Sequence, residues 1–372
     1  MPIAIESYRE EHQNAVRAFN QRLRAGTSEP DLVFYEQCHS AWLPKLDGSP
    51  LYNKYFVAQE DGAVHGAYAL KYEHFFSPEQ GEFVVACYHH SLSEGIIDRR
   101  YFSVGGLLLR DAVRREPMLY ALGMGGYDQP LPKMLKAMGW ELRSVPFYFN
   151  VVHPYRFLRQ MRVLRQSFLQ RWMMDLAAFS GIGWTALEAW QKTKRMRVSS
   201  DLGSVEAVKV EEFADWADKL WLEAKDAYHL ASVRDHRTLT RLYPHSQKHL
   251  TKLCVYQQGR PIGWAVVGER RNDPKYGSLR VGSIVDCWAL PTNAKQIIYC
   301  AALELEANGM NLIVSNQSHK QWRRALEECG FFAAESNFVF ATSKKFSGLL
   351  QKSDFGQFHL NRANGDGLPG NF

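Results

Sequence analysis

The sequence has little of what usually assigns a chain to a functional class. Its six cysteines among 372 residues are scattered singly, without a C-x-x-C pair. This argues against a disulfide scaffold or a structural zinc site, and it suits a reducing compartment. A G-x-S-x-G nucleophile elbow is missing too. The formal net charge of +6 is spread over a long chain and is too weak to indicate nucleic-acid binding by the whole protein.

Long apolar runs are also missing. The N-terminus, MPIAIESYREEHQ, is charged within six residues and has no apolar segment of the kind found in signal peptides. The best candidate for a membrane span, residues 176–187, offers twelve uncharged residues. A bilayer core needs about 20. The sequence therefore predicts a cytoplasmic protein.

Two stretches of the chain predict the same order of helices and strands. Each contains a hairpin that carries two glycines four residues apart, and each has a late helix that ends in Gly followed by an aromatic residue. The offsets are nearly constant: 197 residues from Gly62 to Gly259, and 191 from Gly139 to Gly330. Hairpin glycines recur in many α/β proteins, but the matching element order favours a tandem duplication.

A loop before an apolar helix is the first candidate binding site. From Arg100 to Gly106 the chain reads Arg-Tyr-Phe-Ser-Val-Gly-Gly. Glycines there would let backbone N–H groups approach a ligand, and a helix N-terminus favours negative charge. Arg100 could add a phosphate contact. Glycines are also common at ordinary helix starts, so the loop alone does not decide. The candidate cofactor-binding residues are Arg100, Ser103, Val104, Gly105 and Gly106.

This arrangement resembles the GNAT superfamily of N-acyltransferases, whose acetyl-CoA loop reads Q/R-x-x-G-x-G/A between the fourth strand and the third helix. Arg100-x-x-Ser103-x-Gly105 fits that register, with Ser103 in place of the first glycine. The corresponding loop of the second half, residues 288–294, lacks the pattern. The resemblance therefore implies one site for acetyl-CoA, or another acyl-CoA, in the first half. Leu135 stands where many members have a tyrosine that acts as general acid.

The resemblance also implies the fold. We expect an α/β (α+β) protein of two tandem GNAT-like domains, each a mixed, mainly antiparallel sheet flanked by helices. The expected parts are a domain with the CoA loop (1–152), a basic amphipathic helical linker (153–203), a degenerate GNAT-like domain (204–347) and a Gly/Asn/Asp-rich tail (348–372). The second half and the tail look like the two-domain acyltransferases of bacterial exopolysaccharide and lipid-linked sugar pathways.

Acyl transfer to an amine requires a base, because a free alkylamine has a pKa of about 10.4 and is protonated at neutral pH. The resemblance places the acceptor where the fourth and fifth strands diverge. Glu94 is the first choice as base because it precedes the cofactor loop, although it could be a solvated loop carboxylate. His89 and His90 are adjacent, so only one of them can face the site from a strand. The candidates of the first half are His89, His90, Glu94, Tyr127 and Asp128.

In the second half, Asp286 is the odd residue in the apolar run VGSIVDCWAL, where an unpaired carboxylate would be costly. It could be catalytic, or it could be hydrogen-bonded to the backbone. Asn316, Ser318 and His319 follow the next strand, and Ser318 reads as an ordinary helix N-cap. None of these candidates pairs with another at a metal-ligand spacing, so we expect no metal site.

The segment between the halves is strongly basic. Residues 155–197 hold nine Lys and Arg against two acidic residues, a balance of +7. Apolar side chains recur at three- and four-residue steps from Phe157 to Trp172, which predicts an amphipathic basic helix. It could pack between the domains, lie on an anionic membrane surface at the inner face of the membrane, or contact RNA or another polyanion.

The function implied by the resemblance is transfer of an acetyl or other acyl group from CoA to a primary amine. A small-molecule acceptor such as an amino sugar, or its nucleotide- or lipid-linked form, follows from the narrower resemblance. Two alternatives stay open. A Fem-type aminoacyltransferase would use aminoacyl-tRNA and bind it in a salt-sensitive way. A non-catalytic acyl-CoA-binding or scaffold protein would bind CoA without turnover.

Overall fold

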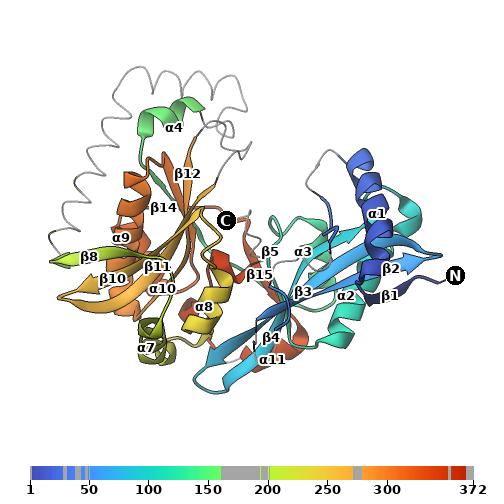
Figure 1. Ribbon diagram of the computed structural model, residues 1–372, viewed down its shortest axis with the longest axis horizontal. Helices are drawn as coiled ribbons and strands as arrows, with labels where there is room; N and C mark the ends of the chain where they lie inside the picture. Colours follow the sequence, from blue (N-terminus) through green and yellow to red (C-terminus); the bar gives the residue numbers. More distant parts are fainter. Residues whose placement is uncertain are drawn as a thin grey trace. The chain divides into compact units, whose positions relative to one another are not determined.

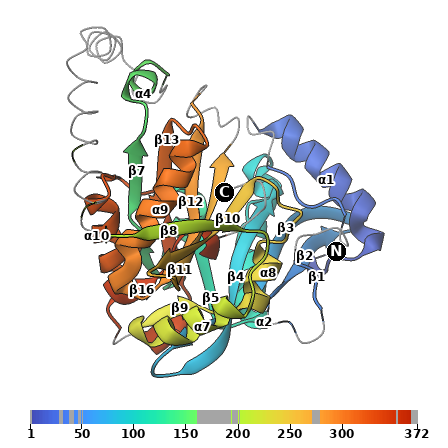
Figure 2. The ribbon, with the colours of Figure 1, turned by 60° about the vertical axis from the view of Figure 1, so that its left-hand side comes forward.

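The structure is a computed structural model that describes residues 2–27, 32–37, 43–46, 49, 51–160, 193, 200, 202–270, 279–350 and 353–365. The chain divides into two compact units. Unit 1 comprises Met1–Phe76, Gln80–Ser144 and Asn337–Ser353. Unit 2 comprises Ser77–Glu79, Val145–Ser336 and Asp354–Phe372. Both units are drawn in Figure 1 and Figure 2.

Unit 1 is built on a mixed sheet with the order β1-β2-β3-β4-β5-β15-β6. β4 and β5 are parallel, whereas β15 is antiparallel to both of its neighbours. The strands are β1 (Ala4–Ser7), β2 (Tyr52–Glu60), β3 (Ala63–Ser77), β4 (Gly81–Ser93), β5 (Leu119–Gly123), β6 (Glu141–Ser144) and β15 (Val339–Thr342). The helices are α1 (Gln13–Gly26), α2 (Val104–Arg115), α3 (Pro130–Ala137) and α11 (Lys344–Leu350).

Helices cover both faces of this sheet because each carries one apolar stripe. α1 buries Phe19 and Leu23 against Val57 at one face, and it crosses β2 and β3 (Figure 1). α2 and α3 bury Leu108 and Leu135 in the core of the other face. Ala15, Phe19 and Leu23 recur at four-residue steps, which predicts a helix that ends at Gly26, and α1 confirms it.

Unit 2 repeats the arrangement, with the sheet order β8-β10-β11-β12-β13-β7-β14 and β12 parallel to β13. α9 lies across β11 and β12 (Figure 2). The strands are β7 (Phe147–Val151), β8 (Val205–Val210), β9 (Leu230–Ser232), β10 (Leu250–Gln257), β11 (Arg260–Arg270), β12 (Val281–Ala289), β13 (Leu312–Asn316), β14 (Phe332–Ala334) and β16 (Phe358–His359). The helices are α4 (Pro154–Gln160), α7 (Asp215–Ala224), α8 (His236–Leu242), α9 (Ala294–Ala307) and α10 (Lys320–Glu328).

Each sheet takes one strand from the other half of the chain. β15 lies between β5 and β6, and β7 lies between β13 and β14. The predicted boundaries at 152 and 347 are therefore wrong: residues 145–152 belong to unit 2, and residues 337–347 belong to unit 1. Residues 142–152, LRSVPFYFNVV, have the composition of one closing strand, but they form two strands, β6 and β7. Pro146 separates them, because proline lacks an N–H and restricts the residue before it.

The predicted linker falls mostly outside the described residues, so the amphipathic helix from Met161 onward is not addressed by the structure. Its first turns form α4, where the buried Phe157 ring stacks on Phe149 of β7 with 6.2 Å between centroids. Among the described helices, none combines the length and the apolarity that a membrane span requires. The tail from Lys352, in which the sequence shows no helix or strand pattern, contains the short strand β16.

Candidate functional site

The ends of β4 and β5 in unit 1 have unusual backbone geometry. The two strands pair at Cys87 and Tyr120, and shortly beyond this pair His90 adopts a φ of 51°. After β5, Met124 has a φ of 64° and lies within a run of glycines that also have positive φ. Such conformations are strained for residues with a side chain, and they are found at bulges and functional sites. Because of this backbone geometry, His89 and His90 do not show the alternation of faces that a regular strand would give them.

The two histidines lie in different environments. His89 is 5% exposed; its Nε2 lies 3.4 Å from Asn53 Oδ1, and its Nδ1 has no partner among the described residues. Burial, assisted by His90 and Lys71, lowers the pKa of His89 well below 6.5. His90 is half-buried, and its Nε2 donates to the Val33 carbonyl oxygen at 2.7 Å. His89 therefore carries a neutral imidazole whose unpartnered nitrogen is buried.

The N-terminus of α2 offers backbone donors. Its N-cap, Ser103, makes no side-chain cap, and the first helical bond runs from the Leu107 N–H to the Ser103 carbonyl oxygen. The N–H groups of Val104, Gly105 and Gly106 have no acceptor among the described residues. These free donors and the helix dipole make the first turn suitable for an anion.

The two glycines of this turn leave space around the donors. A Cβ on Gly105 would meet only Ser93 Cβ, at 3.9 Å, and a Cβ on Gly106 would meet nothing within 4 Å. Neither glycine has a positive φ. Glycine is thus not required by the backbone conformation at either position, and its role here is to leave the N–H groups open.

Arg100 lies at the surface just before this turn. Its guanidinium binds the Asp98 carboxylate through two bonds, of 3.0 and 2.6 Å, and its side chain is 80% exposed. A guanidinium binds phosphate in the same forked geometry as carboxylate. For Arg100 to bind a phosphate in place of the Asp98 carboxylate, only the Arg100 side chain would have to move.

Glu94, the predicted base, lies in a buried ion-pair cluster. Arg22 of α1 donates to both of its oxygens, at 2.6 and 3.0 Å, and His65 Nδ1 lies 2.6 Å from Oε2. Burial raises the pKa of Glu94, but the hydrogen bonds from Arg22 and His65 outweigh it, so the pKa lies below its ordinary value. A carboxylate held in this way is a weak base. The geometry favours a positioning role for Glu94.

The other candidates of unit 1 lie after β5. Tyr127 is 45% exposed, and partial burial raises its pKa, so the phenol keeps its proton at neutral pH. Asp128 is exposed, with one oxygen 3.8 Å from Lys133 Nζ. Leu135 is buried in α3, as its apolar character predicts. Of these residues, Tyr127 is suited to donate a proton.

Asp286 of unit 2 is fully buried and its oxygens are occupied. Oδ2 accepts from Arg234 Nε and from the Tyr243 hydroxyl, both at 2.8 Å. Oδ1 accepts from Asn361 Nδ2 at 2.7 Å and from the Cys287 N–H at 3.0 Å. This geometry does not support a catalytic role for Asp286, since a buried carboxylate whose oxygens are all hydrogen-bonded cannot reach a substrate. Its contacts hold β12, α8 and the tail together.

The tail occupies the space where β12 and β13 diverge. Asn361 bonds Asp286 of β12 and also forms a β-bridge with Gln317, just after β13. The Ser318 N–H donates to the Leu360 carbonyl oxygen at 3.0 Å. Sequence reasoning missed this role because the polar tail carries no periodicity that would predict a buried segment.

Two of the second-half candidates serve these contacts. The N-cap of α10 is His319 and not Ser318, whose hydroxyl instead bonds the tail at Phe358. Burial lowers the pKa of His319 to about 4. Asn316 accepts from Arg362 of the tail at 3.3 Å.

The loop before α9 also differs from its counterpart before α2. Pro291 begins a 3-10 turn, η6 (Pro291–Asn293), and has no N–H to offer. The N–H groups of Asn293 and Ala294 are both consumed by this turn. Unit 2 therefore lacks free donors at these positions.

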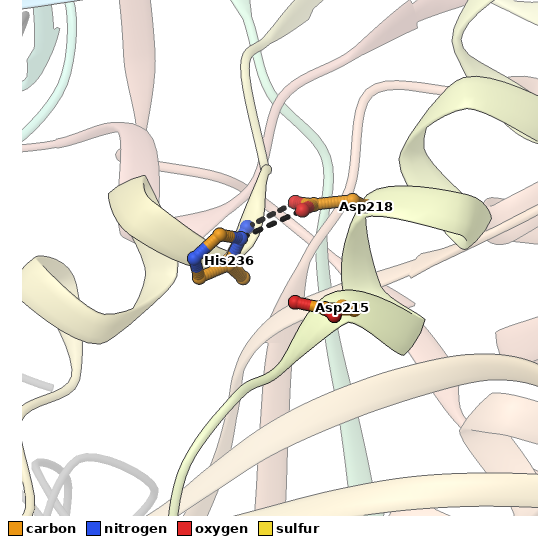
Figure 3. Close-up of side chains that lie close together, drawn as sticks. All are labelled: Asp215, Asp218 and His236. Atoms are coloured by element: carbon orange, nitrogen blue, oxygen red, sulfur yellow. Dashed lines mark hydrogen bonds and ion pairs between the residues drawn. The ribbon is translucent and has the colours of Figure 1, made fainter.

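One group of side chains in unit 2 has ligand atoms close enough together for a metal ion. Asp215, Asp218 and His236 place their ligand atoms within 4.8 Å of one another (Figure 3). Asp218, however, accepts from the His236 N–H at 2.7 Å and contacts His236 Nδ1 at 2.6 Å. These bonds cap α8 and tie it to α7, which accounts for the cluster without a metal.

Comparison with solved structures identifies the fold. Saccharomyces cerevisiae N-myristoyltransferase with bound myristoyl-CoA matches with a TM-score of 0.55 at 10% identity, over 91% of this chain and 82% of that chain. A GCN5-related N-acetyltransferase from Anabaena variabilis matches with a TM-score of 0.50 at 10% identity, over 91% and 72%. No protein-family model and no curated protein matches the sequence. The chain therefore has a GNAT-like acyltransferase fold, and the predicted fold class is confirmed.

Proposed function

We propose that this protein is an N-acyltransferase that transfers an acyl group from acyl-CoA to a primary amine. The observation that supports it most is the first turn of α2. Within an acyltransferase fold, this turn presents three unused N–H groups at Val104, Gly105 and Gly106, with open space beside the glycines. A pyrophosphate is the ligand that such a turn suits. The cofactor site is in unit 1.

The chemistry assigns a role to one side chain. The amine nitrogen attacks the thioester carbonyl carbon, so a C–N bond forms and the C–S bond breaks. Tyr127 gives its proton to the departing CoA thiolate, because its phenol is protonated and accessible. This is general acid catalysis. The proton that the amine loses passes to water, since the buried His89, with its lowered pKa, is as weak a base as Glu94.

The acyl group and the acceptor are the finer parts of this proposal. We propose acetyl-CoA as donor and an amino sugar, or its nucleotide- or lipid-linked form, as acceptor. The yeast N-myristoyltransferase binds myristoyl-CoA, so the donor test includes that chain length. Thermal shift with acetyl-CoA and myristoyl-CoA identifies the donor, because a ligand at 100 times its Kd adds about 2.7 kcal/mol of stability. Thiol release with a panel of amines then identifies the acceptor. No shift with any acyl-CoA would refute the proposal.

Tyr127→Phe is expected to lower kcat by about 100-fold or more while the KM for acyl-CoA stays unchanged. Loss of a general acid typically costs about 10²–10⁴-fold. Steady-state thiol release measures both constants. The matched control is Tyr155→Phe, which changes another exposed tyrosine, in unit 2. Equal kcat values for Tyr127→Phe and the unchanged protein would remove Tyr127 from the mechanism.

A further inference from the structure

An ion-pair cluster and a ring stack hold the loop between β4 and α2 in place. Glu94, at the start of this loop, is bound by Arg22 and His65, and the His65 ring stacks on Tyr101 with 3.9 Å between centroids and 14° between planes. A Cβ on Gly95 would lie 2.9 Å from the Phe102 Cα, so the loop also packs against itself. These contacts fix the backbone immediately before Phe102.

Phe102 nevertheless points its ring into solvent. It is 81% exposed, the largest exposure among the large hydrophobic residues described as exposed. It lies two residues after Arg100 and three after Arg99, both exposed, and it precedes the first residue of α2 by two positions. A rigid loop thus presents an aromatic face and two cations beside the unused N–H groups.

We propose that Phe102 is the stacking platform for the adenine of the acyl donor, with Arg99 beside it for the ribose phosphate. The inference rests on the proposed function and deepens it, because it makes a nucleotide-bearing thioester, CoA, the donor. A carrier protein or free pantetheine thioester has no purine to stack.

The chemistry of CoA matches this arrangement. In CoA a single ribose separates the adenine from the pyrophosphate. The base therefore lies close to the N–H groups that hold the phosphates, as Phe102 does. Purines stack on aromatic rings whatever their hydrogen-bond pattern, and the anionic phosphates match Arg99 and Arg100. The contacts of Glu94, His65 and Tyr101 preorganise the platform, which lowers the cost of ordering it on binding.

The test compares two donors that differ in the nucleotide. Phe102→Ala is expected to raise the Kd for acetyl-CoA about five- to tenfold, the lower end of base–aromatic stacking. The same variant leaves kcat/KM with S-acetylpantetheine unchanged, and Phe102→Tyr, which keeps the ring, binds acetyl-CoA normally. Leu290→Ala is the matched control, since Leu290 is an exposed apolar residue at the equivalent junction of unit 2.

Each contrary outcome has a distinct meaning. If Phe102→Ala leaves the Kd for acetyl-CoA unchanged, or weakens both donors equally, the stacking proposal is overturned while the proposed function stands. If the variant instead releases the protein from anionic vesicles with no change in acetyl-CoA affinity, the exposed ring serves a lipid surface and the proposal is wrong. If the unchanged protein binds no acyl-CoA, both proposals fail.

Discussion

Gly105→Glu is expected to abolish acyl-CoA binding. The new carboxylate would lie at the first turn of α2 and repel the pyrophosphate, and its bulk would block the N–H groups of Val104 and Gly106. A charge-assisted hydrogen bond contributes about 1.5–3 kcal/mol, so the loss of more than one weakens binding by at least about 100-fold. Titration calorimetry with acetyl-CoA measures the loss.

The variant should fold, because Gly105 has no positive φ and an added Cβ would meet only Ser93, at 3.9 Å. The matched control is Asn293→Glu at the same junction of unit 2, where the tail fills the neighbouring strand gap and the N–H groups are used. This control should bind acetyl-CoA normally. The cofactor would belong to unit 2 if Asn293→Glu lost binding while Gly105→Glu kept it.

Arg234→Leu is expected to destabilise unit 2 by about 3–5 kcal/mol, the cost of leaving one partner of a buried ion pair uncompensated. Asp286 is fully buried, and without Arg234 only neutral donors from Tyr243, Asn361 and the Cys287 N–H would remain around it. A change of this size lowers the melting temperature of a domain of 150–250 residues by roughly 6–20 °C. Scanning calorimetry measures the shift.

Two further variants separate the buried charge from simple loss of packing. The double variant Arg234→Leu/Asp286→Leu should recover part of the stability, because it removes the stranded carboxylate as well. Arg100→Leu, which breaks the exposed pair with Asp98, should leave the melting temperature unchanged, since exposed pairs contribute little. If Arg234→Leu proves as mild as Arg100→Leu, the network around Asp286 does not stabilise the unit.

The local sequence pattern was enough to predict most helices and strands of this protein. Apolar spacing predicted α1 and α2, and strands around the glycine pairs at Gly62 and Gly259 predicted the hairpins β2–β3 and β10–β11. Both turns use residues with positive φ, which glycine and its neighbours adopt easily. The small residues before α2 likewise located the turn with free N–H groups. These features depend on residues close together in the chain.

Partners distant in sequence were decided by the tertiary structure alone. A strand's periodicity says which face is buried but not which sheet it joins, so the exchange of β7 and β15 was not predictable. The sequence predicted neither ion pair of Glu94 and Asp286, because Arg22 and Arg234 lie 72 and 52 residues away from them. A carboxylate's role depends on the charges and donors that folding places around it, and spacing along the chain does not record them.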